Sequence, residues 1–336
     1  MTTKTIPSAS FFAGIDVGAE DLFLVIRHNG IATKAQKFAN TPVDRQRLVK
    51  RLLKHPGITV CLEATGAYSL DLALVLTDVE IRLMVLNPKA SHNFAKVLLR
   101  NSKTDGVDAD TLAQYAERMP FQPWKRPSDE ALTLRALARR ISTLTKARAA
   151  AKNQRHALTA SASTPKAVLS DVNLSITELE ARIDQLATHA KAFILEHPLL
   201  ANPFALLLTV KGIGEASAIA LLGELLLLPD GLTHKQWVKS AGLDPRHFKS
   251  GTSVDKRTRI SKAGNRSIRQ ALYMPALSAK THDPHVKGFF DHLIANGKTP
   301  MQAVCAVMRK LLHALHGMIT HNQPFDNSRF YKLPVG

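Results

Sequence analysis

The chain has 336 residues, with 45 Lys and Arg against 27 Asp and Glu and a formal net charge of +18. Its 45% hydrophobic and 21% charged residues exclude a disordered basic tail and indicate a folded protein with a polyanionic partner such as nucleic acid. A single hydrophobic core rarely grows beyond ~250 residues, so more than one domain is expected.

No secretion signal or membrane span is predicted. The opening residues lack a cationic stretch followed by an apolar run of signal-peptide length. The longest apolar run, residues 218–228, is interrupted by Gly223 and Glu224 and is too short to cross a bilayer. Cys61 and Cys305 are far apart and have no neighbours at zinc-site spacing, so both are expected to be buried thiols. We therefore expect a soluble, cytoplasmic protein.

The first part of the chain, residues 11–117, alternates short β-branched and aromatic runs with helical stretches, which is typical of an α/β layer fold. Asn29 and Gly30 form a hairpin-turn signal. Strands are predicted over 11–17, 21–27, 32–38, 59–63 and 82–86, and helices over 43–54 and after Gly66. Three antiparallel strands, followed by strands that alternate with helices, is the order of an RNase H-like sheet.

Two carboxylates are predicted at the ends of neighbouring strands. Asp16 lies among apolar residues in the first strand, where a carboxylate is costly unless it is paired or binds a metal. Glu63 ends the strand 59–63. The carboxyl ends of neighbouring strands open onto one crevice, so the two side chains are expected to converge.

A second acidic pair opens a predicted helix after Lys103. Asp105 and Asp108 are three residues apart and share one helix face, whereas Asp21 and Asp110 are interpreted as surface and capping residues. Asp105 alone could equally be a helix cap. Four converging carboxylates repel one another, which favours bound divalent cations, and Mg²⁺ prefers such hard oxygen ligands. The predicted metal ligands are Asp16, Glu63, Asp105 and Asp108.

Residues 14–18 also resemble the first phosphate loop of actin-like sugar kinases. Those kinases repeat an acidic-glycine motif in a second, larger half. No second copy occurs here, and the C-terminal half is basic and helical. The kinase interpretation is therefore disfavoured.

The second part of the chain follows a turn-rich boundary at residues 122–127. Ser128 is a predicted N-cap, and Pro165 separates two apolar seams at helical spacing. The seams contain Leu134, Leu137, Ile141 and Leu144, then Leu174, Ile176, Leu179, Ile183 and Leu186, and the second ends near Pro198. Two long antiparallel helices are expected. The first is strongly basic, which fits a solvated face, a helix along a phosphate backbone or a dimerisation arm.

The third part, from about residue 201, is predicted to be mainly helical. It contains the segment Lys211-Gly212-Ile213-Gly214 between apolar runs. A glycine turn between short helices can present backbone N–H groups to a phosphate, as helix-hairpin-helix modules do. An ordinary tight helical turn is the alternative.

A basic loop follows, rich in glycine and hydroxyl groups. Between Lys235 and Arg269 there are ten Lys or Arg and two acids, Asp244 and Asp255. A serine among cations can attack a phosphodiester, because positive charge favours the alkoxide and stabilises charge on the phosphate. On this chemistry Ser250, Ser253 and Ser261 are nearly equivalent, and all three could merely donate hydrogen bonds to phosphates.

Taken in order, several segments carry a resemblance to a known family. They are GIDVG around Asp16, CLEATGAY around Glu63, KTDGVDA around Asp105, then KGIG, AGLDPRHFKSGTSV and RISKAGNRSIRQALYMPA. Together they resemble the DEDD transposases of the IS110 insertion-sequence family, which includes Piv-type DNA invertases and bridge-RNA-guided recombinases. The resemblance covers nearly the whole chain, and the ordered set is specific although each segment alone is weak.

The resemblance implies an RuvC-like DEDD domain over 8–122, a coiled-coil helical hairpin over 128–198 and a C-terminal transposase domain over 201–330. It implies that the four acids bind Mg²⁺ and that Ser250 is the nucleophile that forms a covalent link to DNA. His247 and Lys249 are given no catalytic role.

The same resemblance implies the partners: donor and target DNA, a structured guide RNA, and further copies of the chain in a dimer or tetramer, in the bacterial cytoplasm at the nucleoid. The predicted nucleic-acid contacts are Lys211, Gly212, Gly214, Arg246, Lys249, Arg259, Lys262 and Arg266. Two other functions stay open. One is a metal-dependent nuclease or junction resolvase that uses water as its nucleophile, and the other is a non-catalytic nucleic-acid-binding protein.

Overall fold

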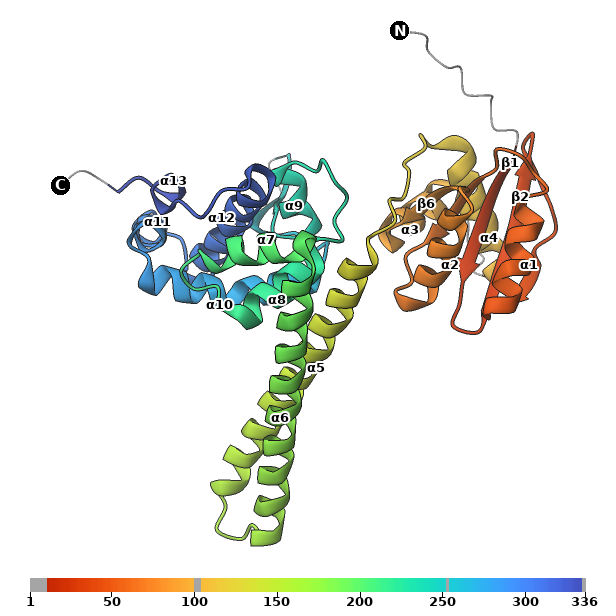
Figure 1. Ribbon diagram of the computed structural model, residues 1–336. Helices are drawn as coiled ribbons and strands as arrows, with labels where there is room; N and C mark the ends of the chain where they lie inside the picture. The colour runs from red at the N-terminus through yellow and green to blue at the C-terminus, as the bar shows by residue number, and fades with distance from the viewer. Residues whose placement is uncertain (1–10, 100–103, 252–253, 334–336) are drawn as a thin grey trace. The chain divides into compact units, whose positions relative to one another are not determined.

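The computed structural model describes residues 11–99, 104–251 and 254–333 and divides into two compact units, Met1–Arg126 and Pro127–Gly336 (Figure 1). Each unit is described by itself. None of the described helices is both long and apolar enough to cross a membrane.

The first unit is built on a six-stranded mixed sheet with the order β3-β2-β1-β5-β6, in which β4 also pairs with β2. β1 is antiparallel to β2 and parallel to β5, and β5 is parallel to β6. The strands are β1 (Phe11–Val17), β2 (Asp21–His28), β3 (Ile31–Ala32), β4 (Gln36–Ala39), β5 (Thr59–Glu63) and β6 (Arg82–Leu86). β1 is therefore a central strand, as expected for the strand that carries Asp16.

Helices cover both faces of this sheet. Ala13 and Ile15 of β1 share one buried cluster with Leu48 and Leu72, which lie on α1 (Pro42–Leu52) and α2 (Ala67–Asp78). On the opposite face, Cys61 and Met84 pack with Leu112 of α4 (Asp105–Arg118), and α3 (Pro88–Val97) contacts α4. Cys61 is buried as predicted, and burial raises the pKa of its thiol to about 12. Cys305 is only partly buried.

Two features of the first unit differ from the sequence prediction. The expected third strand is split into β3 and β4, because the backbone N–H of Thr33 donates to Ile26 O at 2.8 Å while Thr33 Oγ1 accepts from Ile26 N at 3.1 Å. The helix α3 was not predicted at all. It begins with Asn87, whose side chain accepts from Lys89 N, and has Pro88 in its first turn.

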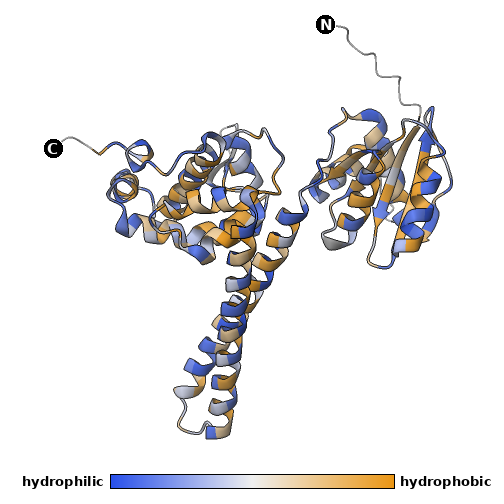
Figure 2. Cartoon of the chain, viewed as in Figure 1, coloured by the Kyte–Doolittle hydropathy of each residue, from blue (hydrophilic) through white to orange (hydrophobic). Residues whose placement is uncertain are grey.

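The second unit begins with two 31-residue helices, α5 (Asp129–Thr159) and α6 (Lys166–Glu196), which run antiparallel side by side (Figure 1). Ser128 caps α5 by accepting from Ala131 N, and Pro165 precedes α6, both as predicted. Figure 2 shows hydrophilic and hydrophobic colouring alternating along the pair. Most of the predicted seam is buried or partly buried, but Leu174 is 60% exposed, so its assignment to the seam is wrong. Val172, four residues before Ile176, is buried there instead.

The remainder of the second unit is mainly helical, as predicted. Its helices are α7 (Pro198–Leu208), α8 (Glu215–Leu225), α9 (His234–Ser240), α10 (Arg266–His282), α11 (Pro284–Ala295), α12 (Pro300–His321) and α13 (Asn327–Phe330). α12 lies at the centre of the helical core, because Val307, Leu311 and Leu315 are fully buried and α12 contacts α7, α9, α10 and α11. The structure adds an antiparallel hairpin, β7 (Pro245–Ser250) and β8 (Val254–Ile260).

Candidate active site

The pleat of β1 places Asp16 on the α4 face of the sheet. Ala13, Ile15 and Val17 belong to the cluster on the α1 and α2 face, so the alternating residues Gly14 and Asp16 point the other way. Glu63 points to the α4 face as well, because it lies two residues after Cys61, which packs against α4. In the parallel pairing of β1 and β5, Ile15 is opposite Leu62, and the next step of this register sets Asp16 beside Glu63.

The helix α4 brings the other two acids to the same place. A β-carbon on Gly14 would stand 1.9 Å from the carbonyl oxygen of Ala109 and 2.3 Å from the amide nitrogen of Ala113, so only glycine allows this approach of helix to strand. Asp105 and Asp108 lie in the first turn of α4, which Thr104 caps by accepting from Val107 N. The N-cap of α4 is therefore Thr104, and the alternative interpretation of Asp105 as the helix cap is wrong.

The electrostatics of Asp16 show that the four predicted acids act on one another. Burial, followed by the negative charges of Asp108, Asp105 and Glu63, raises the pKa of Asp16 from 3.8 to about 6. No described Lys or Arg forms an ion pair with any of the four. The cluster thus holds an excess of negative charge that nearby described cations do not neutralise.

Hard carboxylate oxygens in excess negative charge suit a divalent cation such as Mg²⁺. As the side chains stand, however, no three His, Cys, Asp or Glu among the described residues converge closely enough to hold a metal ion. The donor chemistry therefore fits, and the carboxylates would have to turn inward to reach a shared ion.

Ser91 of α3 is a neighbour of Glu63 that the sequence interpretation missed. Its Oγ lies 2.5 Å from Glu63 Oε2 and 2.9 Å from the carbonyl oxygen of Pro88, and the side chain is buried. A hydroxyl donates one proton, so Ser91 donates to one of these oxygens at a time. The helix-start signal at Asn87 and Pro88 could have predicted α3, but nothing in the sequence pairs Ser91 with Glu63.

The remaining acids that face the sheet are structural. Arg27 of β2 is buried and donates to Asp110 at 2.7 Å, to Glu117 at 2.9 Å and to the carbonyl oxygen of Gly30 at 2.6 Å. The interpretation of Asp110 as a capping residue is therefore wrong: it joins α4 to β2 through a buried cation. Asp21 pairs with Lys37 at 2.7 Å and is a surface residue as predicted.

Ser250 ends the strand β7 rather than lying in a loop. Its backbone pairs with Val254, and Gly251, with φ of +55°, begins the turn of the hairpin. The expected loop forms strands because β-branched residues favour an extended backbone, and β8 contains three of them, Val254, Thr258 and Ile260. Ser253 lies outside the described residues.

Close contacts hold the base of this hairpin. Ser261 Oγ donates to Asp244 Oδ1 at 2.5 Å, and Ser261 N donates to the Asp244 carbonyl at 2.8 Å. Arg269 Nη1 donates to the carbonyl oxygen of Ala241 at 2.7 Å. A β-carbon on Gly264 would stand 2.3 Å from Ser240 O. The Ser261 hydroxyl therefore braces Asp244, a contact that the sequence alone could not predict.

The predicted nucleic-acid residues lie in the second unit, at the hairpin and on its helical neighbours. Lys211, Arg246, Arg259, Lys262 and Arg266 are all exposed. Arg246 and Arg259 are opposite each other in the β7–β8 register, as are Lys249 and Asp255.

The glycine turn between α7 and α8 has a packing role. A β-carbon on Gly212, whose φ is +101°, would stand 2.7 Å from Ala279 N and 2.8 Å from Pro275 O of α10. Gly214, by contrast, has open space at that position and precedes α8. Close packing thus explains Gly212, while Gly214 keeps its backbone accessible.

Two known protein families match segments of this chain that together reach into both units. Residues 13–162 match the IS110 DEDD family described as a transposase, and residues 204–291 match the transposase family IS116/IS110/IS902. Among solved structures, the Thermus thermophilus RuvC structure covers 34% of this chain and 99% of its own, at 15% identity and a TM-score of 0.26. This last similarity is too weak to bear on the fold.

Similar proteins extend over most of the chain. The pilin gene-inverting protein of Moraxella lacunata is 32% identical over 274 residues, which cover 79% of this chain and 81% of that protein. Its counterpart in Moraxella bovis is 31% identical over the same shares. The uncharacterized 43.6 kDa protein of insertion element IS110 of Streptomyces coelicolor is 27% identical over 48% of this chain and 38% of its own length. The chain belongs to the IS110 family of transposases and is a DNA recombination enzyme.

Proposed function

We propose that this enzyme cuts and rejoins DNA through Ser250, which becomes covalently linked to a DNA phosphate, and that Asp16, Glu63, Asp105 and Asp108 hold Mg²⁺ for the reaction. The observation that carries the proposal is the raised pKa of Asp16, to which the other three carboxylates all contribute. A concentration of negative charge of this kind is costly in a folded protein unless a cation or a catalytic task requires it.

In the proposed reaction the Ser250 oxygen forms a bond to phosphorus while one backbone phosphorus–oxygen bond breaks. The serine proton leaves with a general base or water, and the departing deoxyribose oxygen takes up a proton. The reverse reaction with a deoxyribose hydroxyl of another strand end restores the phosphodiester and frees the serine. Because one ester replaces another, strand exchange needs no external energy source.

Each group has a separate role in this proposal. The four carboxylates would bind Mg²⁺, which when bound stabilises negative charge on phosphate oxygens. Ser91 would orient the Glu63 carboxylate. The ten cations near the hairpin would attract the DNA backbone, and exposed Arg246, Arg259, Lys262 and Arg266 would contact phosphates, together with Lys211, Gly212, Gly214 and Lys249. The acids lie in the first unit and the serine in the second, so both must engage the same DNA, within one chain or between chains.

We further propose the finer architecture that the family resemblance implies. It consists of an RuvC-like domain over 8–122, a coiled coil over 128–198 and a transposase domain over 201–330 with a helix-hairpin-helix at α7 and α8. The antiparallel pairing of α5 and α6 supports the coiled coil, and the exposed Leu174 supports a contact with a further chain in a dimer or tetramer. The names of the relatives include both gene inversion and transposition, so the proposal covers either outcome.

Ser250→Ala provides the decisive test. Incubation with DNA, denaturation in detergent and electrophoresis should show a covalent protein–DNA adduct for the wild-type protein and none for Ser250→Ala, with DNA binding unchanged. Ser253→Ala is the matched control and should keep the adduct. Adducts that persist in Ser250→Ala and vanish in Ser253→Ala would transfer the role to Ser253.

The same experiment separates the nuclease alternative. If Ser250→Ala still cuts DNA in the presence of Mg²⁺ while Asp16→Asn does not, water is the nucleophile and the protein is a metal-dependent nuclease. If neither change alters the DNA products, the acids and the serine are not catalytic.

We also propose that a structured RNA selects the DNA. The excess of cations fits an RNA partner as well as DNA. Purification of the protein with and without ribonuclease, followed by sequencing of the bound RNA, should recover one discrete RNA, and changes in that RNA should redirect the DNA products. Recovery of only heterogeneous cellular RNA would contradict this part of the proposal.

A further inference from the structure

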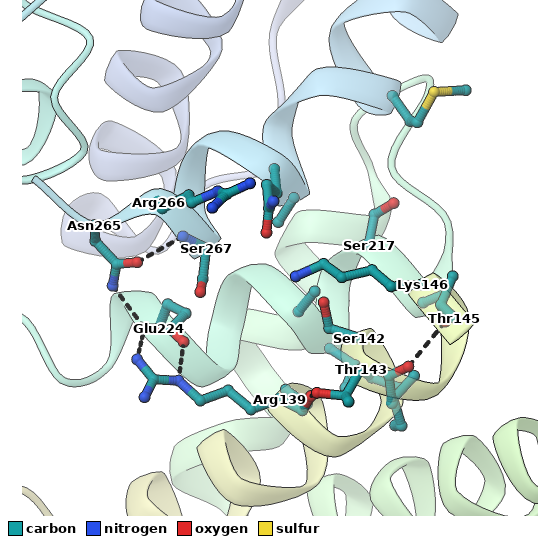
Figure 3. Close-up of a pocket in the computed structure, with 18 residues that line it drawn as sticks. Arg139, Ser142, Thr143, Thr145, Lys146, Ser217, Glu224, Asn265, Arg266 and Ser267 are labelled. Carbon is teal, nitrogen blue, oxygen red and sulfur yellow. Dashed lines mark hydrogen bonds and ion pairs between the residues drawn. The ribbon is translucent and has the colours of Figure 1, made fainter. Parts of the chain in front are cut away.

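The second unit contains a groove of about 680 Å³, and Arg266 is the one residue of its described lining that already has a role in the proposed function (Figure 3). Three helices form its walls: α5 through residues 138–146, α8 through residues 216–224 and α10 with its preceding residue Asn265. Within the unit, α8 packs directly on both α5 and α10. A cavity of this size accommodates a nucleotide-sized ligand.

The single acid in the groove is already neutralised. Glu224 is 4% exposed and accepts from Arg139 Nε at 2.7 Å, from Arg139 Nη2 at 3.2 Å and from Asn265 Nδ2 at 2.6 Å. Asn265 in turn accepts from Ser267 N at 2.8 Å and so caps α10. This network fixes the positions of the three helices and leaves no free negative charge in the groove.

Two cations in the groove have no partner among the described residues. Lys146 and Arg266 come from different helices, are exposed, and form no ion pair or hydrogen bond with any described side chain. Figure 3 shows Lys146 extending its ammonium group toward the middle of the groove, with Ser142 and Ser217 on the adjacent walls. The hydroxyls of Ser142 and Ser217 also have no partner among the described residues. Two free cations beside free hydroxyls form a set of donors for an anion.

Much of the groove lining is apolar. It includes small or branched aliphatic side chains and Met274, which is 63% exposed. The aliphatic lining residues are Ala138, Ile141, Ala216, Ile219, Ala220 and Ala271. Cations and hydroxyls together with aliphatic side chains match a sugar–phosphate backbone, since the phosphate needs charge and donors while the sugar needs apolar contact.

A short segment, held by hydrogen bonds, joins the groove to the hairpin of β7 and β8. Only residues 261–265 separate the end of β8 from the start of α10, and Asn265 N donates to Ser240 O at 2.6 Å. The contacts of Ser261 with Asp244 and of Arg269 with Ala241 hold the same segment. A strand bound in the groove would therefore lie beside the base of the β7–β8 hairpin, and Ser250 lies at the turn end of the same hairpin.

We propose that this groove binds the sugar–phosphate backbone of a nucleic-acid strand, with Lys146 and Arg266 contacting phosphates and Ser142 and Ser217 donating hydrogen bonds. The inference rests on the proposed action of the enzyme on nucleic acid. Single-stranded DNA, duplex DNA and RNA share this backbone, and the test distinguishes them.

The test measures binding of the full-length protein to short oligonucleotides without Mg²⁺, which removes any contribution of the acidic site. Labelled single-stranded DNA, duplex DNA and RNA of equal length are titrated over a range of salt concentrations. The double variant Lys146→Gln/Arg266→Gln should lose affinity for at least one of them on the order of 10-fold, and the slope of log K against log salt should fall by about 1.5. The nucleic acid that shows this change identifies the strand held in the groove.

A matched control removes the same charge elsewhere in the unit. Lys287→Gln/Lys298→Gln changes two exposed cations that do not line the groove, and it should reduce affinity by less than about twofold. Ser217→Phe obstructs the groove without a change of charge and should weaken binding of the same nucleic acid while the thermal unfolding temperature stays within a few degrees.

Equal losses in the two double variants would overturn the proposal, because the effect would then come from net charge alone. Unchanged binding of all three nucleic acids by Lys146→Gln/Arg266→Gln would overturn it as well. Ser250→Ala should bind like the wild type in this assay. Adducts formed by that variant would contradict the serine mechanism and leave the result for the groove intact.

Discussion

Gly14 of β1 and Ala109 of α4 approach so closely that a β-carbon on Gly14 would stand 1.9 Å from the Ala109 carbonyl oxygen. This contact sets the distance between the strand that carries Asp16 and the helix that carries Asp105 and Asp108. The mutual repulsion of these carboxylates is therefore maintained by backbone packing, since α4 cannot move away without losing its contact with the sheet.

We expect Gly14→Ala to damage the first unit. The added methyl group meets backbone atoms that cannot rotate away, so the variant should lose about 3 kcal/mol of stability or fail to fold. Urea unfolding monitored by circular dichroism provides the measurement. Gly106→Ala is the matched control on α4, because its β-carbon would meet only the side chain of exposed Ala35, at 3.1 Å, and it should unfold close to the wild-type midpoint. Similar losses in both variants would contradict the role of the contact.

The raised pKa of Asp16 predicts a pH-dependent stability in the absence of metal. The folded protein holds this proton more tightly than the unfolded chain, so the stabilising contribution is complete below pH 3.8 and is lost as the pH rises through about 6. Asp16→Asn removes the titration. The metal-free variant should therefore unfold at a higher temperature than the wild type at pH 8, and the difference should shrink toward pH 4.5.

The control for this pH dependence is Asp21→Asn, which removes a carboxylate on β2 that is paired with Lys37 on the surface. It should give no gain at pH 8, because an exposed pair contributes little. A lower unfolding temperature of Asp16→Asn than of the wild type at pH 8 would show that the carboxylates do not repel one another.

Several elements could be predicted from the sequence because their cause is local. The strands that carry Asp16 and Glu63 follow from β-branched runs, and α5 follows from Ser128 and the apolar spacing of Leu134 and Ile141. These signals depend on neighbours within one or two helical turns, or on alternate residues of a strand.

Other features depend on contacts between distant residues and could not be predicted. Thr33 splits a strand by bonding to Ile26, and Asp110 is drawn into a buried ion pair by Arg27, 83 residues away. Glu224 looked like an interruption of an apolar run, yet it is the buried acceptor that joins α5, α8 and α10. The four acids were predictable as a group because their spacing reflects strand ends and a helix start. The bracing role of Ser261 was not predictable, since its contact with Asp244 is visible only in the fold.

Ser91 should affect the proposed metal site through Glu63. If its hydroxyl orients the Glu63 carboxylate, Ser91→Ala should weaken the stabilisation of the protein by Mg²⁺, with an apparent affinity lower by about tenfold or more. Thermal unfolding at increasing Mg²⁺ measures this affinity. Thr77→Ala removes a hydroxyl that bonds only within α2, to Ala73 O, and should leave the affinity unchanged. An unchanged Mg²⁺ response in Ser91→Ala would limit Ser91 to its hydrogen bond with the Pro88 carbonyl oxygen within α3.

The buried carboxylate of Glu224 has a charged partner, Arg139, and a neutral one, Asn265, and loss of the charged partner should cost stability. Arg139→Met leaves the Glu224 charge buried with Asn265 as its single described hydrogen-bond donor and Arg135 as a nearby cation, and we expect a loss of about 3 kcal/mol in urea unfolding, because a buried charge that has lost its ion-pair partner is costly. Adding Glu224→Gln to Arg139→Met removes that charge and should recover at least half of the loss, although two contacts are then absent. Arg140→Met, on an exposed position of the same helix, should change stability by less than about 0.5 kcal/mol. If instead the effects of the changes at Arg139 and Glu224 on stability are additive, the Glu224 carboxylate is solvated in solution. Apolar contacts alone would then hold the three helices together. The main one is the close crossing of α5 and α8, where Gly223 faces Ala138.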